Sequence, residues 1–204
     1  MHGLTREERR ELEARVREAA PGDAGAAGVA FLVREEASPP DPLAAFAASP
    51  AAERFLFEDP AGGRLAALGA ELTLDGVGPQ RLAGISRQAA ALRCAADGTG
   101  PPCCGPILVG GFAFASSPPG PGWIGFPPAR FVLPSLLLAS AGGRTRLTVC
   151  VAVPPEADAA ALVAVAAQGI DRLRAALEAA GAAPSRGEEP AVFRARADQP
   201  HARY

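Results

Sequence analysis

Four acidic residues are the candidates for general acid–base chemistry in this sequence: Glu58, Asp59, Glu71 and Asp75. Two carboxyl groups in one cleft can divide the roles of proton donor and proton acceptor. However, Glu58 and Asp59 are adjacent in the turn-forming stretch EDPAGG, and Glu71 is expected at the solvent-exposed end of a strand. Because nothing in their spacing pairs these carboxylates, we expect each of them to be solvated.

Nucleophilic catalysis lacks the residues that it requires. A serine nucleophile needs a base, and the two histidines, His2 and His201, lie in terminal segments. All 20 basic residues are arginine, which excludes a Schiff-base lysine and a P-loop lysine. The stretch VGGFAF (residues 109–114) has the Gly-Gly of a close backbone approach, but it lacks the G-x-G-x-x-G spacing of a phosphate cradle.

The four cysteines are Cys94, Cys103, Cys104 and Cys150, and none of them forms a C-x-x-C pair. With only the terminal histidines as nitrogen ligands, the sequence predicts no metal site among them. Free thiols in a reducing compartment are the expected state.

The elements that must position these residues follow from hydrophobic periodicity and turn residues. Thr5 and Glu8 form a capping box for the first predicted helix, and Asp41-Pro42 begin the second. Strands follow one another in groups rather than alternating with helices, which predicts one α+β domain over residues 1–204, with a largely antiparallel sheet and flanking helices. Helices are predicted at 5–20, 41–48, 79–96 and 154–180, and strands at 28–36, 54–72 (a hairpin), 107–114, 129–140, 144–153 and 191–197.

Net charge and hydropathy limit the cellular environment and the kinds of partner that we expect for this chain. The net charge is −2 and the arginines are scattered, so we expect no nucleic-acid partner. The charged first twenty residues contain no apolar signal region. The longest apolar run, 131–139, is interrupted by Pro134 and falls short of the roughly 20 residues that span a bilayer. The sequence therefore predicts a cytoplasmic protein that does not enter the membrane.

Aromatic residues gather in the window 107–138, which includes the only tryptophan, Trp123. Phe112 and Phe114 are two residues apart in a predicted strand, so their side chains share one face. The side chains of Trp123 and Phe126 are expected to pack against the sheet edge and to hold the Pro/Gly-rich loop there. We interpret the window as core packing rather than as a ligand site.

Several motifs, in this order, resemble the amino-terminal region of menaquinone-type isochorismate synthases, which are chorismate-utilising enzymes. The likeness covers about residues 28–153. The chain departs from the family pattern at Ala115, where an acid is usual, and at Leu56-Phe57, where Tyr or Trp is usual. The matching motifs are Asp41–Leu43, Phe55–Pro60, Ala67–Ala70, Gly110–Phe114, Trp123, Phe126-Pro127 and Phe131–Pro134.

The resemblance implies that chorismate is isomerised to isochorismate with Mg²⁺, as a precursor of menaquinone or of a siderophore. In the family a lysine activates water, one glutamate acts as general acid and other glutamates hold the metal, all in the carboxy-terminal half. This chain has no lysine and stops at ADQPHARY. The resemblance therefore implies an amino-terminal portion that contains no catalytic, cofactor-binding or metal-binding residue and is inactive alone. We expect the missing half to cover an apolar sheet face, with 147–153 as its most apolar strand.

Two alternatives stay open. The first is another chorismate enzyme, such as an anthranilate, aminodeoxychorismate or salicylate synthase, although the Leu-Leu-Glu-Ser type segment of the first two does not occur here. The second is a non-catalytic binding or scaffold domain that pairs with a separate subunit.

Overall fold

The computed structural model describes residues 1–21, 27–95, 105–114 and 127–182. The described residues form helices and strands in the following order: α1 (Arg6–Ala19), β1 (Gly28–Glu35), α2 (Pro42–Ala48), β2 (Arg54–Glu58), β3 (Arg64–Leu68), β4 (Leu72–Gly76), α3 (Arg81–Ala90), β5 (Arg93–Ala95), β6 (Val109–Phe112), β7 (Ala129–Leu133), β8 (Leu136–Ala141), β9 (Arg144–Val153) and α4 (Ala159–Ala182).

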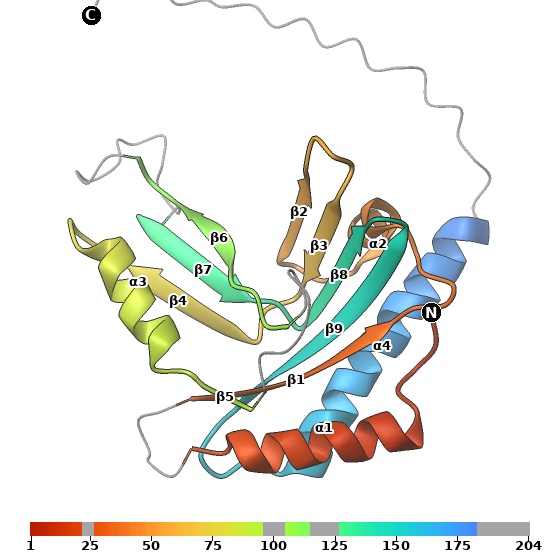
Figure 1. The fold of residues 1–204 in the computed structure, drawn as a ribbon, viewed down its shortest axis with the longest axis horizontal. Helices are drawn as coiled ribbons and strands as arrows, with labels where there is room; N and C mark the ends of the chain where they lie inside the picture. Colours follow the sequence, from red (N-terminus) through yellow and green to blue (C-terminus); the bar gives the residue numbers. More distant parts are fainter. Residues whose placement is uncertain (22–26, 96–104, 115–126, 183–204) are drawn as a thin grey trace, which may run out of the picture.

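The strands form two sheets, which Figure 1 shows diverging from a common junction. One sheet has six strands in the order β2-β3-β8-β9-β1-β5, and the other has three in the order β4-β7-β6. All neighbouring pairs are antiparallel except β1 and β5, which are parallel. The predicted α+β class with a largely antiparallel arrangement is therefore confirmed, whereas the prediction of one sheet is wrong.

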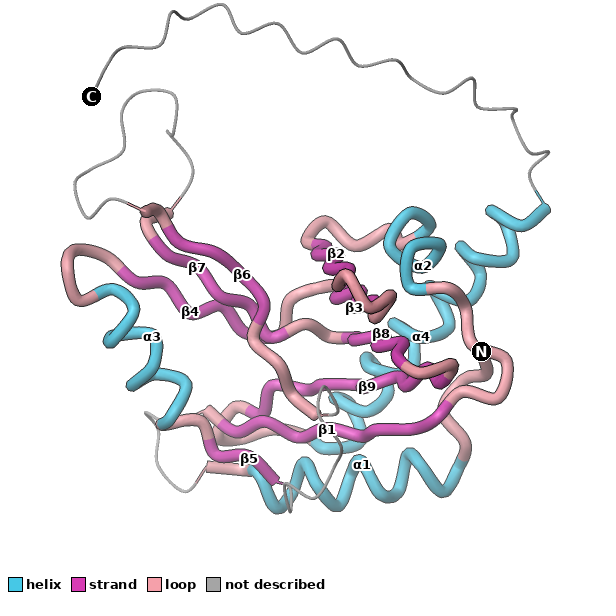
Figure 2. The backbone as a smooth tube through the Cα atoms, turned by 45° about the horizontal axis from the view of Figure 1, so that its top comes forward, coloured by secondary structure: helices cyan, strands magenta, loops and turns pink. Residues whose placement is uncertain are grey.

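Helices α1, α2 and α4 lie on one face of the six-stranded sheet, and α3 lies on the three-stranded sheet (Figures 1 and 2). Helix α1 buries Leu12 and Val16, which are one turn apart, against this sheet. The predicted capping box is confirmed, because Thr5 Oγ1 accepts from Glu8 N and the Glu8 carboxylate accepts from Thr5 N. Burial of this apolar stripe provides most of the stability of such a helix.

Strand β9 is buried on both faces, as its nearly continuous apolar sequence predicts. Leu147 and Val149 belong to the core beneath the helices. Cys150, on the opposite face, packs in a second cluster with Phe31 and Leu133, which link the two sheets. The second sheet thus covers this part of the open face, so the prediction that β9 leaves an apolar face uncovered is wrong.

The predicted single strand 129–140 is two strands in different sheets. β7 ends at Leu133 and β8 begins at Leu136, with Pro134 and Ser135 between them. Proline has no N–H to donate to a ladder, so a strand interior cannot continue through it. The chain crosses from the three-stranded to the six-stranded sheet at this point, where Ser135 O accepts from Cys150 N at 2.9 Å.

One strand and the bounds of two helices differ from the sequence prediction. Strand β4 is absent from the prediction, although LTLDG alternates apolar and polar residues as a one-sided strand does. The helix predicted over 79–96 ends at Ala90, and its last predicted turn is strand β5, which pairs with β1. Helix α4 begins at Ala159 rather than at Pro154, because Asp158 Oδ1 accepts from Ala160 N at 2.9 Å and caps the helix there.

Other local predictions hold. The Gly142-Gly143 turn joins β8 to β9, and both glycines have the positive φ that a two-residue hairpin turn requires. Pro42 occupies the first turn of α2 as predicted, but the preceding Asp41 makes no capping hydrogen bond and pairs instead with Arg64. The strand predicted at 191–197 lies outside the described residues. The described helices all lack the length or the continuous hydrophobicity that a bilayer span requires.

Candidate functional site

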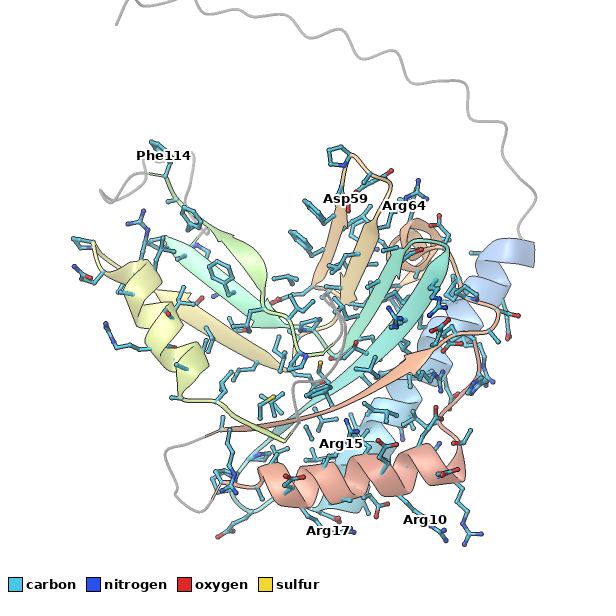
Figure 3. All side chains as sticks on the ribbon, viewed as in Figure 1. Arg10, Arg15, Arg17, Asp59, Arg64 and Phe114 are labelled. Atoms are coloured by element: carbon cyan, nitrogen blue, oxygen red, sulfur yellow. The ribbon has the colours of Figure 1, made fainter. Side chains whose placement is uncertain are left out.

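Glu58 and Asp59 stabilise the hairpin of β2 and β3, at the end where Figure 3 labels Asp59 and Arg64. Asp59 Oδ1 accepts from Ala61 N at 2.7 Å and from Gly63 N at 3.0 Å, which fixes the turn. Glu58 is exposed and pairs with Arg64 across the two strands at 3.3 Å. The predicted hairpin is confirmed, and both carboxylates have structural partners.

Glu71 lies at the junction of the two sheets rather than on a solvent-exposed strand face, which corrects the sequence prediction. Its Oε1 accepts from Ser135 Oγ at 2.7 Å and its Oε2 accepts from Ala152 N at 3.2 Å. Pairing of β8 with β9 ends at Leu136 and Val149, so no β8 residue lies opposite Ala152. The Glu71 carboxylate takes the place of the missing strand partner.

Asp75 is paired with Arg130 across β4 and β7. Arg130 Nε and Nη2 each donate to one carboxylate oxygen of Asp75 at 2.8 Å. These charge-assisted hydrogen bonds lower the pKa of Asp75 from its usual value of 3.8. A carboxyl group with a lowered pKa and both oxygens occupied is a poor proton acceptor, so the geometry does not favour catalysis by Asp75.

The two described cysteines lie on different strands, Cys94 on β5 and Cys150 on β9, and both are free thiols. Burial raises the pKa of both thiols. For Cys150 the shift is large, and the negative charge of Glu71 adds to it. A thiol with a raised pKa is a weak nucleophile, because the thiolate is the reactive form. Cys103 and Cys104 lie outside the described residues.

The structure offers no metal-binding group in residues 1–21, 27–95, 105–114 or 127–182, since no three His, Cys, Asp or Glu side chains come together there. His2 Nδ1 lies 3.3 Å from Arg34 Nη1 at the surface. His201 lies outside the described residues. The described side chains therefore do not fit a Mg²⁺ ion.

Gly110 permits a close approach of β6 to β7. A Cβ atom added to Gly110 would lie 2.0 Å from Arg130 O, whereas one added to Gly111 would meet nothing within 4 Å. The close backbone approach that the Gly-Gly pair predicts is therefore present at Gly110, and its partner is a neighbouring strand.

The prediction that the aromatic window packs in the core is wrong for two of its residues. Phe112 is half exposed and Phe114 is fully exposed. Phe112 is the last residue of β6, and Phe114 follows two residues later. β6 is an edge strand of the three-stranded sheet, while α3 packs on β4 and β7. Phe131 is partly buried and packs with Leu74 and Ile85 as predicted. Trp123 and Phe126 lie outside the described residues.

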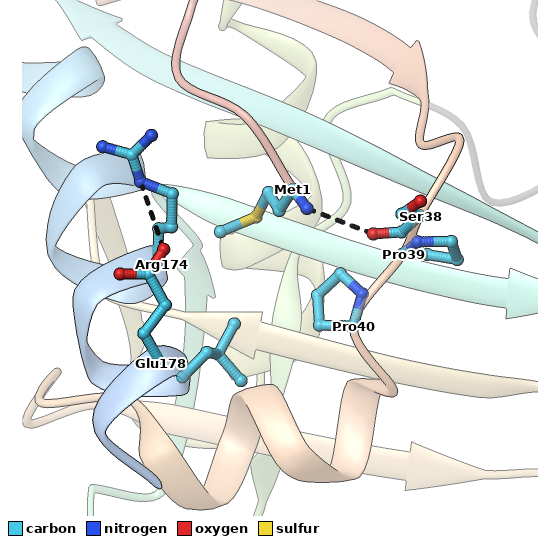
Figure 4. A pocket seen from close by; sticks show the side chains of 7 residues that line it. Met1, Ser38, Pro39, Pro40, Arg174 and Glu178 are labelled. Carbon is cyan, nitrogen blue, oxygen red and sulfur yellow. Dashed lines mark hydrogen bonds and ion pairs between the residues drawn. The ribbon is translucent and has the colours of Figure 1, made fainter. Parts of the chain in front are cut away.

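One shallow surface pocket of about 270 Å³ lies between the amino terminus, the loop before α2 and the end of α4 (Figure 4). The Met1 amino group donates to Ser38 O at 3.1 Å across it, and Arg174 lies 4.0 Å from Glu178 on its helical side. The charged groups of this pocket thus have partners within it. The lining residues are Met1, Ser38, Pro39, Pro40, Arg174, Leu177 and Glu178.

Arg81 is a residue that the sequence does not single out among twenty arginines. It is the first residue of α3, only 8% exposed, and its Nη2 donates to Ala113 O at 2.6 Å. An arginine at the start of a helix, with no acidic residue in the first turn, is the signal that could have identified it.

Comparisons with known proteins place these features in context. A sequence model of the family described as "Chorismate binding enzyme" matches residues 18–201. Among solved structures, the chain is similar to the menaquinone-specific isochorismate synthase of Escherichia coli, with 15% identity and a TM-score of 0.41. That similarity covers 79% of this chain and 33% of the other, so the chain spans about a third of that enzyme's length. A search of curated proteins gave no significant match.

Proposed function

The chain belongs to the chorismate-binding enzyme family, and on this premise we propose that it forms part of an isochorismate synthase, which converts chorismate to isochorismate. The observation that carries the proposal is the family match over residues 18–201. The ordered motifs from Asp41–Leu43 to Phe131–Pro134 support the isochorismate synthase subtype by resemblance.

The residues that perform the chemistry are proposed to lie outside these 204 residues. The sequence contains no lysine to activate water. Asp59 stabilises a turn, Glu71 stabilises the junction of the two sheets, and Asp75 forms a cross-strand pair. Mg²⁺, if the complete enzyme uses it, would have its ligands in the same additional part. This chain then supplies the scaffold on which the catalytic part is positioned.

The surface of the described residues supports the proposal that this chain is a scaffold for an additional, catalytic part. Phe55 and Phe57 of β2 alternate with residues of the helix-covered face, so their side chains lie on the opposite face of the six-stranded sheet. Phe57 is 54% exposed and Phe55 is partly buried. We propose that the additional part of the enzyme packs here, at the β2 side of the sheet, rather than on β9.

The test is to extend the coding sequence downstream and to compare the longer protein with the 204-residue chain. Chorismate with Mg²⁺ is supplied to both, and products are separated by liquid chromatography. We expect isochorismate from the longer protein and no turnover by the 204-residue chain. Turnover by the shorter chain would contradict the assignment of catalysis to other residues.

The same assay separates the alternatives. Anthranilate, aminodeoxychorismate or salicylate as the product would assign the chain to another chorismate enzyme. A natural stop codon after Tyr204, with no lysine-bearing motif encoded nearby, would favour a non-catalytic binding or scaffold domain. Asp59, Glu71 and Asp75 each have a structural hydrogen-bond partner, and this is the observation that supports the second candidate.

A further inference from the structure

The strand β6 has a backbone edge with which no described strand pairs. It is the outer strand of the three-stranded sheet, whose order is β4-β7-β6. Ala113 N donates to Pro128 O at 2.7 Å, so residues 109, 111 and 113 direct their backbone groups toward β7. The N–H and C=O groups of Gly110 and Phe112 therefore point away from β7, and both residues are exposed. Backbone groups in this position can pair with a further strand.

Other strand edges of the two described sheets are protected. Helix α3 packs against β4, and Gln88 Nε2 donates to Asp75 O of that strand at 3.3 Å. The outer strand β2 begins with Arg54 and ends with Glu58, and β5 has only three residues. Charged side chains, very short strands and covering helices are the usual protection of sheet edges. β6, with the sequence Val-Gly-Gly-Phe, has neither a charged residue nor a covering helix.

The side chain of Phe112 is also left open at this edge. Phe112 pairs with Ala129, which belongs to the cluster beneath α3, so both side chains lie on the α3 face of the sheet. Phe112 is nevertheless 54% exposed, because α3 packs on β4 and β7. Residues 98–129 contain no charged side chain. The edge is therefore suited to an uncharged strand with an apolar side chain opposite Phe112.

The open edge of β6 faces the surface that we assign to the additional part of the enzyme. Figures 1 and 2 both show β6 on the side of its sheet that is directed toward β2. β2 is the outer strand of the six-stranded sheet and contains Phe57, which is also 54% exposed. A strand added to β6 would therefore extend the three-stranded sheet toward the packing surface proposed on β2.

We propose that β6 pairs with a strand of the additional part of the enzyme, and that this strand places an apolar side chain opposite Phe112. Gly110 and Phe112 exchange backbone hydrogen bonds with the added strand. The side chain opposite Phe112 covers the exposed ring and removes apolar surface from water. The inference rests on the proposed function only for its occupant, the additional part of the same enzyme, and it requires no particular reaction.

The test is amide hydrogen exchange, measured residue by residue in the 204-residue chain and in the protein extended downstream of Tyr204. In the shorter chain, the amides of Gly110 and Phe112 should exchange rapidly, whereas the Gly111 amide, which faces β7, should already be protected. In the extended protein, we expect exchange at Gly110 and Phe112 to slow by about a hundredfold or more, with little change at Gly111. Unchanged exchange at Gly110 and Phe112 would overturn the proposal.

The shorter chain provides a further check. Slow exchange at Gly110 and Phe112 in the 204-residue chain itself would mean that a second copy or another segment already fills the edge, and the proposal would be wrong. A reading frame that ends after Tyr204 would remove the proposed occupant and would also overturn it. Unchanged exchange in an extended protein that converts chorismate to isochorismate would overturn this inference alone. Protection in a protein that forms another product would contradict only the proposed function.

A pair of variants tests the contact with Phe112. In the extended protein, Phe112→Ala should speed exchange of the Gly110 amide by about tenfold, because the added strand loses its side-chain contact. Val165→Ala, at a similarly exposed apolar residue on α4, should leave that rate within about twofold. Equal rates in the two variants would contradict the placement of an apolar side chain opposite Phe112.

Discussion

Ser135 Oγ donates a hydrogen bond of 2.7 Å to Glu71 Oε1, and this contact joins residues that are 64 positions apart. Glu71 precedes the first strand of the three-stranded sheet, and Ser135 lies where the chain returns to the six-stranded sheet. The other carboxylate oxygen accepts from Ala152 N in β9. One side chain thus links two of the crossings of the chain between the sheets, the one before β4 and the one after β7.

Replacement of Glu71 by glutamine should lower the free energy of unfolding by about 1–3 kcal/mol, because the amide nitrogen of glutamine would face a donor that a carboxylate oxygen now satisfies. Glu58→Gln is the matched control, since its ion pair with Arg64 is exposed to solvent and contributes little to stability. Urea denaturation of both variants measures the difference. Equal stability of the two variants would show that the junction does not depend on the Glu71 carboxylate.

Gly110→Ala should destabilise the chain by about 1–3 kcal/mol, because the added methyl group would collide with Arg130 O. Gly111→Ala, one residue further along β6, has free space around its Cβ position. It should be neutral or stabilise by up to about 1 kcal/mol, since alanine loses less backbone entropy than glycine. Thermal unfolding monitored by circular dichroism compares the two, and a more stable Gly110→Ala variant would contradict the close strand approach.

Much of the fold follows from local sequence. The capping box at Thr5, the Pro42 start of α2, the 58–63 turn and the Gly142-Gly143 turn are predictable because each depends on residues within one turn of one another. The division into two sheets is not, since it depends on pairing between β4 and β7, which are far apart in sequence. Pro134 was the local signal for that division, and the continuous apolar run around it concealed the break.

The candidate site is less predictable than the fold. Sequence patterns correctly indicate that the acidic residues do not form a pair, but the role of Glu71 depends on where β8 ends relative to β9. Arg81 is inconspicuous in the sequence because its burial results from the approach of α3 to residues 113–114. Phe112 and Phe114 alternate like core residues, yet both are exposed, because α3 packs on β4 and β7 rather than over the edge strand β6.

The Asp75–Arg130 pair predicts a pH-dependent contribution to stability. The arginine hydrogen bonds lower the pKa of Asp75 in the folded state below its usual 3.8, so the folded chain holds its Asp75 proton less tightly than the unfolded chain. The stabilisation is therefore fully present above about pH 4 and is lost as the pH falls through the lower folded-state pKa. Asp75→Asn should unfold at lower urea concentration than the unmodified chain at pH 7, and the gap should narrow below pH 4.

Salt provides the control for that pair. The side chains of Asp75 and Arg130 are both nearly half exposed. Asp75→Asn should therefore lower the free energy of unfolding by less than Glu71→Gln does, and this loss should shrink in 1 M NaCl. A gap that persists unchanged at low pH would assign the effect of Asp75→Asn to packing rather than to the carboxylate charge.

Cys150 should resist alkylation in the folded protein. It is 1% exposed, and its raised pKa keeps the thiol protonated at neutral pH. Cys94, which is exposed on β5, should react faster although its own pKa is also raised by partial burial. Iodoacetamide labelling with peptide mass spectrometry, with and without urea, measures both rates. Rapid labelling of Cys150 without denaturant would show that the interface between the two sheets opens readily.

Helix α4 provides a test of the core beneath the six-stranded sheet. Ile170 is fully buried in the same cluster as Leu147 and Val149, so Ile170→Ala should cost about 2–5 kcal/mol through lost burial and the cavity left behind. Val165 lies on the same helix but is 57% exposed, and Val165→Ala should change stability by less than about 0.5 kcal/mol. Urea denaturation at one pH gives both values. If the two substitutions lower the free energy of unfolding equally, α4 does not pack on β9 through the face that contains Ile170.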